Sequence, residues 1–188
     1  MKALVIILKI FLFTSLLLIH SAMASYGESF PAQSDLTNFV SWNKSNRLFS
    51  IERSKNKNYI QYDVRLTENS DLLDSSPVTV YWVLENGEQE ELSLIERKYA
   101  YGIDSQKKVE RNRFRIHLVA LKDREIIVEK MDGFYRAVVS INGKQAILER
   151  IYVESKERLT GLPKVLYVDL FGRTMKRGFP MRERIIPQ

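Results

Sequence analysis

The feature that most constrains the fold is the regular alternation of apolar and polar residues between Leu48 and Leu66. On either side of a five-residue Ser-Lys-Asn-Lys-Asn loop, every second side chain is apolar. Successive side chains of a strand point to opposite faces, so this period of two predicts strands with one buried face. The loop suits a hairpin, because asparagine adopts the left-handed conformation that such a turn requires.

The same pattern returns later in the chain. Pro77 opens a run that is apolar on both faces, typical of a central strand with proline confined to its first position. Asn142-Gly143 is the strongest short hairpin signal. Further alternating runs lie at residues 114–120, 126–128, 134–141, 146–153 and 164–171. The sequence predicts an all-β domain, an antiparallel β-sandwich of about eight strands with one short helix, or alternatively an up-and-down barrel.

The one change of period lies between Glu88 and Tyr101, where apolar residues follow helical spacing. Glutamates at the start of this segment and basic residues near its end match the helix dipole, and Gly102 is placed for a C-terminal cap. The alternative is a strand containing Leu92 and Leu94, paired back across the Asn86-Gly87 turn, because short apolar runs are ambiguous.

The N-terminus predicts export. Lys2 and Lys9 precede a short apolar run, which ends in small residues that suit signal peptidase. We expect a signal peptide at residues 1–24, with an uncleaved membrane anchor as the alternative. A poorly ordered arm at 25–46, a single β-domain at 47–172 and a basic tail at 173–188 would follow. The predicted location is secreted or periplasmic, with no transmembrane segment after cleavage.

Composition excludes several kinds of site. The chain has no cysteine, so it forms no disulfide, thiolate nucleophile or zinc-thiolate centre. Without the expected signal it carries 27 basic and 23 acidic side chains, and no aromatic stacking motif accompanies them. We therefore expect no nucleic-acid partner. No P-loop or G-x-S-x-G motif occurs, and we predict no cofactor, no metal and no catalytic residue.

Charge is segregated along the body of the domain. The segment from Glu68 to Glu96 holds eight carboxylates and no Lys or Arg, whereas 53–57 and 107–115 are locally basic. Such segregation predicts a contact with a partner or internal pairing of the two signs. The candidate binding residues are Arg53, Lys55, Asn56, Lys57, Arg113, Arg115 and His117.

Two weaker signals for chemistry are present. His117 is the one histidine after the expected signal, and its alternation places it on a polar strand face beside Arg115. Asp63, Glu149 and Asp169 lie within predicted strands and could serve glycoside hydrolysis, although pairing with nearby arginines explains them as well.

Several motifs together resemble a family of bacterial secreted proteins known as a domain of unknown function. They are F-x-I-x-R-S-K-N-K-N from Phe49, P-V-T-V-Y-W from Pro77, E-R-x-x-A-Y-G from Glu96 and D-L-F-G from Asp169. The resemblance implies an exported bacterial protein and supplies no activity. The leading hypothesis is a non-enzymatic β-domain that binds a protein partner or an envelope component. The alternatives are a secreted hydrolase of glycan or ester, and a lipocalin-like carrier of an apolar ligand.

Overall fold

The computed structural model describes residues 46–54, 57–156 and 164–187. Within them the chain forms eleven strands and one short helix, so the all-β prediction with one helix is confirmed. The elements are β1 (Arg47–Arg53), β2 (Tyr59–Val64), β3 (Val78–Val83), β4 (Gln89–Glu91), α2 (Leu94–Tyr99), β5 (Ile103–Glu110), β6 (Arg113–Leu118), β7 (Leu121–Met131), β8 (Phe134–Ile141), β9 (Lys144–Lys156), β10 (Lys164–Thr174) and β11 (Pro180–Ile185).

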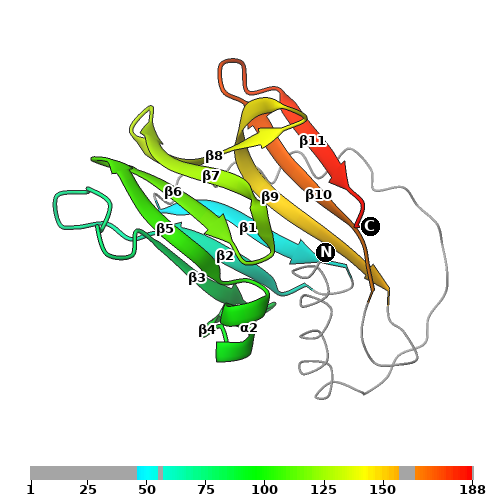
Figure 1. Cartoon of the computed structure of the whole chain (residues 1–188). Helices are drawn as coiled ribbons and strands as arrows, with labels where there is room; N and C mark the ends of the chain where they lie inside the picture. The colour runs from blue at the N-terminus through cyan, green and yellow to red at the C-terminus, as the bar shows by residue number, and fades with distance from the viewer. Residues whose placement is uncertain (1–45, 55–56, 157–163, 188) are drawn as a thin grey trace.

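The long strand β9 organises the sheet. One edge of β9 pairs along its length with β10, which in turn pairs with β11. The other edge is shared, because residues 144–147 pair with β8 and residues 150–153 pair with β1. The sheet therefore forks at β9 into two arms, β1 to β4 and β8 to β5, which curl into a half-barrel (Figure 1).

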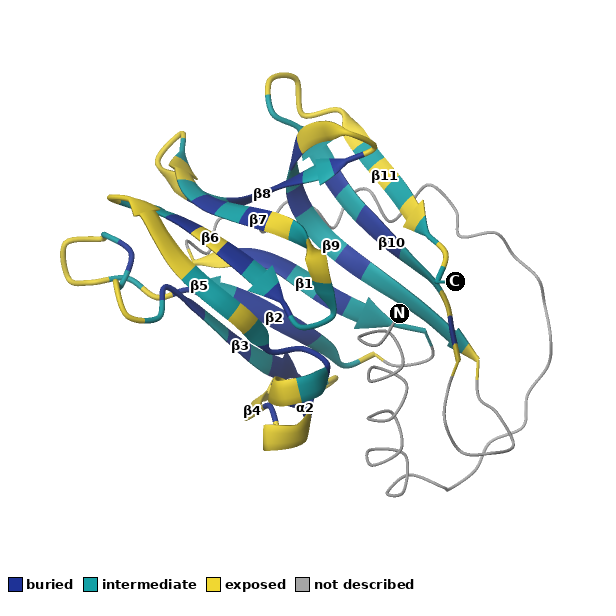
Figure 2. Ribbon diagram, viewed as in Figure 1, coloured by how far each residue is buried: buried dark blue, intermediate teal, exposed yellow. Residues whose placement is uncertain are grey.

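The core lies between the two arms. Buried residues alternate with exposed ones along the strands, as the dark bands of Figure 2 show. Phe49 of β1 stacks on Tyr62 of β2 with ring centroids 4.4 Å apart. Phe114 and Ile116 of β6 belong to the same buried cluster, with 1% and 0% of their surface exposed. The centre of the half-barrel is therefore occupied by a cluster of buried apolar side chains.

Side chains close the seam where the two arms meet, between β3 and β5. The Gln106 side chain accepts a hydrogen bond from the Val78 backbone N–H at 3.0 Å and donates to its carbonyl at 3.4 Å. The Gln106 carboxamide thus makes the two backbone hydrogen bonds to Val78 that a neighbouring strand would otherwise make. Asn112 accepts a hydrogen bond from the Leu72 N–H at 2.8 Å, and Lys108 pairs with Asp74. These contacts satisfy polar groups along an edge that backbone pairing leaves open.

The predicted hairpin turn at Asn142-Gly143 is confirmed, and Asp132-Gly133 forms a similar turn between β7 and β8. Asn142 and Gly143 have φ of 49° and 74°, and Asp132 and Gly133 have 49° and 84°. Two successive residues with positive φ fit the twist of the flanking strands. β8 and β9 accordingly pair in register on either side of Asn142-Gly143.

The pairing of β1 with β9 departs from the predicted antiparallel arrangement. These strands are parallel, with Ile51 opposite Ile151, and the sheet is therefore mixed. Sequence alternation defines the faces of a strand but not the direction of its neighbour. Because the arms belong to one forked, curled sheet, the architecture lies between the predicted sandwich and barrel.

The helix is shorter than predicted. Residues 89–91 form β4 and pair with β3 across the Asn86-Gly87 turn, as in the alternative interpretation, but Leu92 follows this strand and Leu94 belongs to the helix. Helix α2 begins after Ser93, whose side chain and that of Glu96 form a reciprocal capping box. The C-terminal cap is Ala100, and Gly102 serves another purpose: a Cβ there would lie 1.7 Å from the Arg97 carbonyl oxygen.

Two strands were not predicted. β5 is a largely exposed edge strand, IDSQKKVE, without apolar alternation. β11 comes from the segment expected as a basic tail, and it pairs with β10, with its Met181 and Ile185 packed against the core. The predicted signal peptide and almost all of the predicted arm lie outside the described residues, as do Lys55 and Asn56. Among the described residues, no helix has the length and apolar character to cross a membrane.

Candidate functional site

Arg53 and Lys57, the described basic residues at the two ends of the loop after β1, contact other side chains of the chain. Lys57 forms an ion pair with Glu85 at 2.5 Å, and the Asn58 side chain accepts a hydrogen bond from the Glu85 backbone N–H. Arg53 lies over the Trp82 ring, with its guanidinium carbon 4.9 Å from the ring centroid. The pairing of opposite charges within the chain, expected as the competitor to partner binding, is therefore present at Lys57.

The basic residues of β6 are also occupied. Arg113 pairs with Glu129 at 3.0 Å, and Arg115 pairs with Glu125 at 2.5 Å. His117 is half-buried, and its Nδ1 lies 3.1 Å from the Ser105 hydroxyl. The β6 residues and the basic loop are thus two separate places in the structure, and Lys57, Arg113 and Arg115 each pair with a carboxylate.

The three candidate acids each have a separate partner on the outer face of the sheet. Asp63 accepts a hydrogen bond from the Tyr81 hydroxyl at 2.6 Å. Arg173 pairs with Glu149 at 2.6 Å, and burial raises the pKa of Glu149 although Arg173 opposes that shift. The Arg184 guanidinium lowers the pKa of Asp169, and Arg182 adds to the effect. These contacts account for the acids as strand-to-strand ion pairs and hydrogen bonds.

Metal-binding side chains do not gather in the structure. Among residues 46–54, 57–156 and 164–187, no three His, Asp or Glu residues are placed to hold an ion. The prediction of no metal stays a prediction.

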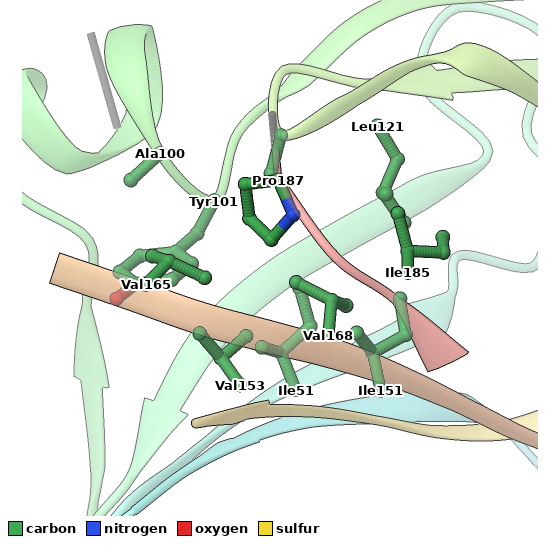
Figure 3. A pocket seen from close by; sticks show the side chains of 11 residues that line it. Ile51, Ala100, Tyr101, Leu121, Ile151, Val153, Val165, Val168, Ile185 and Pro187 are labelled. Atoms are coloured by element: carbon green, nitrogen blue, oxygen red, sulfur yellow. The ribbon is translucent and has the colours of Figure 1, made fainter. Parts of the chain in front are cut away.

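A hollow of about 100 Å³ opens at one end of the half-barrel, and we call it the end hollow. All of its lining side chains but one tyrosine are aliphatic or proline. Figure 3 shows them converging from several elements. The lining residues are Ile51, Ala100, Tyr101, Ala120, Leu121, Ile151, Val153, Val165, Val168, Ile185 and Pro187.

Local irregularities in the sheet create this space. β8 pairs with the first part of β9 and leaves the second part to β1, so the inner face there is covered by turns instead of a strand. The β6–β7 turn supplies Ala120, and the start of β7 supplies Leu121. In β10 a bulge follows Val165, and as a result Val165 and Val168, three positions apart, both line the hollow.

Tyr101 forms the one polar wall, and its position is fixed from several sides. Its backbone carbonyl accepts a hydrogen bond from the buried Tyr62 hydroxyl, and its ring meets Trp82 edge-on at 5.6 Å. Its own hydroxyl accepts a hydrogen bond from Arg53 Nη1 at 3.3 Å. Burial raises the pKa of the Tyr101 phenol, although Arg53 opposes the shift, so the hydroxyl keeps its proton at neutral pH.

Comparison with known proteins identifies the family. A family model described as Domain of unknown function (DUF4833) matches residues 49–184. The chain is a DUF4833 protein. A search of curated proteins and a search of solved structures found no match. The resemblance seen in the sequence is therefore confirmed at the level of the family.

The DUF4833 match begins at Phe49 in β1 and ends at Arg184 in β11. The matched region thus includes both arms of the sheet and every lining residue of the end hollow except Ile185 and Pro187. The hollow itself was not predicted from the sequence. In the sequence its valines look like ordinary core residues. The feature that distinguishes Val165 is the bulge that follows it, and that bulge depends on how β10 pairs with β9.

In the DUF4833 fold this arrangement offers apolar burial together with a phenol and a nearby guanidinium. Apolar burial supplies affinity, and the polar groups at its edge supply orientation. Among the described residues, the hollow contains no carboxylate, histidine or serine that could act as acid, base or nucleophile. Its chemistry suits reversible binding.

Proposed function

We propose that this protein is an exported, non-enzymatic binding domain that takes the apolar part of a ligand into the end hollow. The observation that carries the proposal is the hollow's lining, which consists of aliphatic side chains and one tyrosine held on a rigid sheet. Export is supported by the sequence of the first 24 residues, which has the three regions of a bacterial signal peptide.

The proposal modifies two of the sequence-based hypotheses. The cluster of buried side chains at the centre of the half-barrel, where Phe49 stacks on Tyr62, argues against the deep cavity of a lipocalin-like carrier. The end hollow is smaller than the 150 Å³ apolar cavity that accommodates benzene, so it suits a chain end or an apolar side chain and not a whole lipid. Of the basic residues proposed as contacts that the structure describes, Arg53 is the one that donates a hydrogen bond to a wall of the hollow, at the Tyr101 hydroxyl.

Titration with a small neutral ligand tests the proposal. The valine and isoleucine methyl groups are ¹³C-labelled and followed by NMR as 1-hexanol is added. We expect saturable shifts for Val153, Val165 and Val168, and none for Val64 or Val80 in the filled core, which lie outside the lining. Uniform or absent shifts would contradict the proposal.

Two variants, each of which enlarges one side chain to leucine, separate binding in the hollow from a general effect of a larger side chain. Ala120→Leu places a larger side chain in the hollow and should abolish the shifts. Val109→Leu enlarges an exposed side chain of β5 and should leave them unchanged. If both variants retained the shifts, the ligand would bind elsewhere.

A further inference from the structure

We propose that the turn between β10 and β11 docks on the surface of an anionic lipid bilayer. This turn, residues 175–179, is called the hairpin tip. It belongs to the segment that the sequence presented as a basic tail, and it lies at the end of the sheet far from α2 (Figure 2). Val165 lines the end hollow at the other end of β10, roughly 25 Å along the strand. The inference is therefore independent of the proposed function.

The hairpin tip carries two basic side chains, Lys176 and Arg177, that are exposed to solvent. Among residues 46–54, 57–156 and 164–187, no carboxylate forms an ion pair with either of them, and the acid of β11, Glu183, pairs with Arg124. The arginines in the strands of the same hairpin do pair with carboxylates: they are Arg173, Arg182 and Arg184. The positive charge of the tip is thus available to a partner outside the chain.

Hydrogen bonds between Thr174 and Phe179 hold the tip in one shape. The Thr174 N–H donates to the Phe179 carbonyl at 2.9 Å, and the Phe179 N–H donates to the Thr174 hydroxyl at 3.0 Å. Gly178 has a φ of 65°, which a glycine adopts without steric cost, and its N–H donates to the Thr174 carbonyl. A turn that is already ordered loses little conformational freedom when it binds.

An apolar ring stands beside these charges. Phe179 is 57% exposed although it is one of the largest apolar side chains of the domain. Lys144, exposed at the start of β9, lies at the same end of the sheet, because Ala146 pairs with Thr174. An anionic bilayer matches both features, since its head groups attract lysine and arginine and its acyl boundary accepts an aromatic ring. An acidic polymer would meet the charges but would offer no apolar phase to the ring.

Helix α2 provides the contrast within the molecule. Leu94 and Ile95 are 85% and 50% exposed, so apolar side chains are accessible there as well. The neighbouring strand β4 is exposed and contains Glu90 and Glu91, and Glu91 lies 3.7 Å from Arg97 of the helix. An anionic surface is repelled by these acids. We therefore expect the hairpin tip, and not α2, to meet the bilayer.

A fluorophore placed at the tip tests the contact in the full chain. The chain has no cysteine, so Met175→Cys gives a single site for the environment-sensitive dye NBD. The vesicles are phosphatidylcholine alone, or phosphatidylcholine with about one-third phosphatidylglycerol. We expect the dye emission to rise and shift to the blue with the phosphatidylglycerol vesicles and to stay unchanged with phosphatidylcholine. The same dye on Leu94→Cys should respond to neither.

Variants in the labelled protein assign the roles of charge and ring. Lys176→Ala with Arg177→Ala should weaken vesicle binding about thirtyfold, since each basic side chain at an anionic surface contributes about fivefold. Lys98→Ala with Lys107→Ala is the matched control: it removes the same charge from exposed positions elsewhere and should change binding less than about twofold. Phe179→Ala should weaken binding about fivefold through loss of the buried ring.

Several results would overturn the bilayer proposal. One is an equal response of the tip dye to both kinds of vesicle, or no response to either. Another is an equal loss in the two double variants, which would mean that only net charge matters. If Phe179→Ala bound as tightly as the wild type and soluble polyglutamate displaced the vesicles, the partner would be an acidic polymer and not a bilayer. These results leave the 1-hexanol titration of the end hollow unaffected, so the two proposals can fail separately.

Discussion

The two faces of β10 differ in how completely their side chains contact other parts of the protein. On the outer face Asp169 is 1% exposed and pairs with both Arg182 and Arg184, and the Arg184 guanidinium lies 3.6 Å from the Tyr167 ring centroid. On the inner face Val165 and Val168 border space that no side chain of the described residues fills. The comparison shows that charged side chains on the outer face of β10 pair across strands, whereas the unfilled apolar space on its inner face is where we propose that a ligand binds.

The largest expected effect is on the outer face. Asp169→Ala removes the acceptor shared by Arg182 and Arg184, and we expect a loss of about 2 to 3 kcal/mol in the free energy of unfolding. The arginines are half-exposed and can be hydrated, which keeps the loss below that of a fully buried pair. Urea denaturation measures it. The exposed pair of Lys108 and Asp74 is the control, and Lys108→Ala should cost less than about 1 kcal/mol.

Added volume should separate the hollow from the filled core. Ala137 is fully buried in the central cluster, and Ala137→Leu should lower the free energy of unfolding by about 2 kcal/mol through overpacking. Ala120→Leu adds the same atoms beside the hollow and should change stability by less than about 0.5 kcal/mol. Equal losses in thermal or urea unfolding would mean that the hollow is as tightly packed as the core.

The seam between the arms should be less sensitive than the core. Gln106→Leu leaves the N–H of Val78, itself 2% exposed, without its hydrogen bond, and we expect a loss of about 1.5 kcal/mol. Gln145→Leu, at an exposed position of β9, is the matched control and should stay within about 0.5 kcal/mol. A loss confined to the control would show that the seam contributes nothing to stability.

Low pH should weaken the ion pairs on the outer face and leave the packing around the end hollow unchanged. Arginine partners hold the pKa of Asp169 and of Glu183 below their ordinary values, through Arg184 and Arg124 respectively. A carboxylate with a lowered folded-state pKa stabilises the fold above its unfolded pKa of about 4 and loses that contribution as the pH falls through the folded value. The loss of stability at low pH should be smaller than the loss caused by Asp169→Ala, because a neutral carboxyl still accepts hydrogen bonds.

Urea unfolding at pH 7, 5 and 3 tests this for the wild type and Asp169→Asn. The stability difference between them should be constant from pH 7 to 5 and shrink by pH 3. A difference that is the same at all three pH values would mean that the charge of Asp169 does not stabilise the fold.

The parts of the fold that the sequence predicts are those encoded by patterns within a few neighbouring residues. The period-two runs and the Asn142-Gly143 turn located most strands, because alternation and turn chemistry act within a few residues. The parallel pairing of Ile51 with Ile151 joins positions a hundred residues apart, and no local pattern encodes it. The edge strand β5 was missed because its side chains are mostly solvated, so the signal of a buried face is absent.

The candidate site was predicted in part. Arg53 was singled out for its charge, and the structure places it at the edge of the end hollow, where stacking on Trp82 and not the loop sequence determines its direction. Arg113 and Arg115 were chosen for the same reason, yet each lies opposite a glutamate of β7. A basic segment shows that charge is present, but the partner across the strand decides whether it is available.

Xenon binding in a crystal of the protein tests most directly whether the end hollow is open apolar space. Xenon occupies empty apolar cavities without any specific group to bind it. We expect a xenon peak between Val153, Val168 and Ile185, and none among the filled core around Phe49 and Tyr62. A hollow already filled by protein side chains, with no xenon in it, would contradict the binding site proposed here.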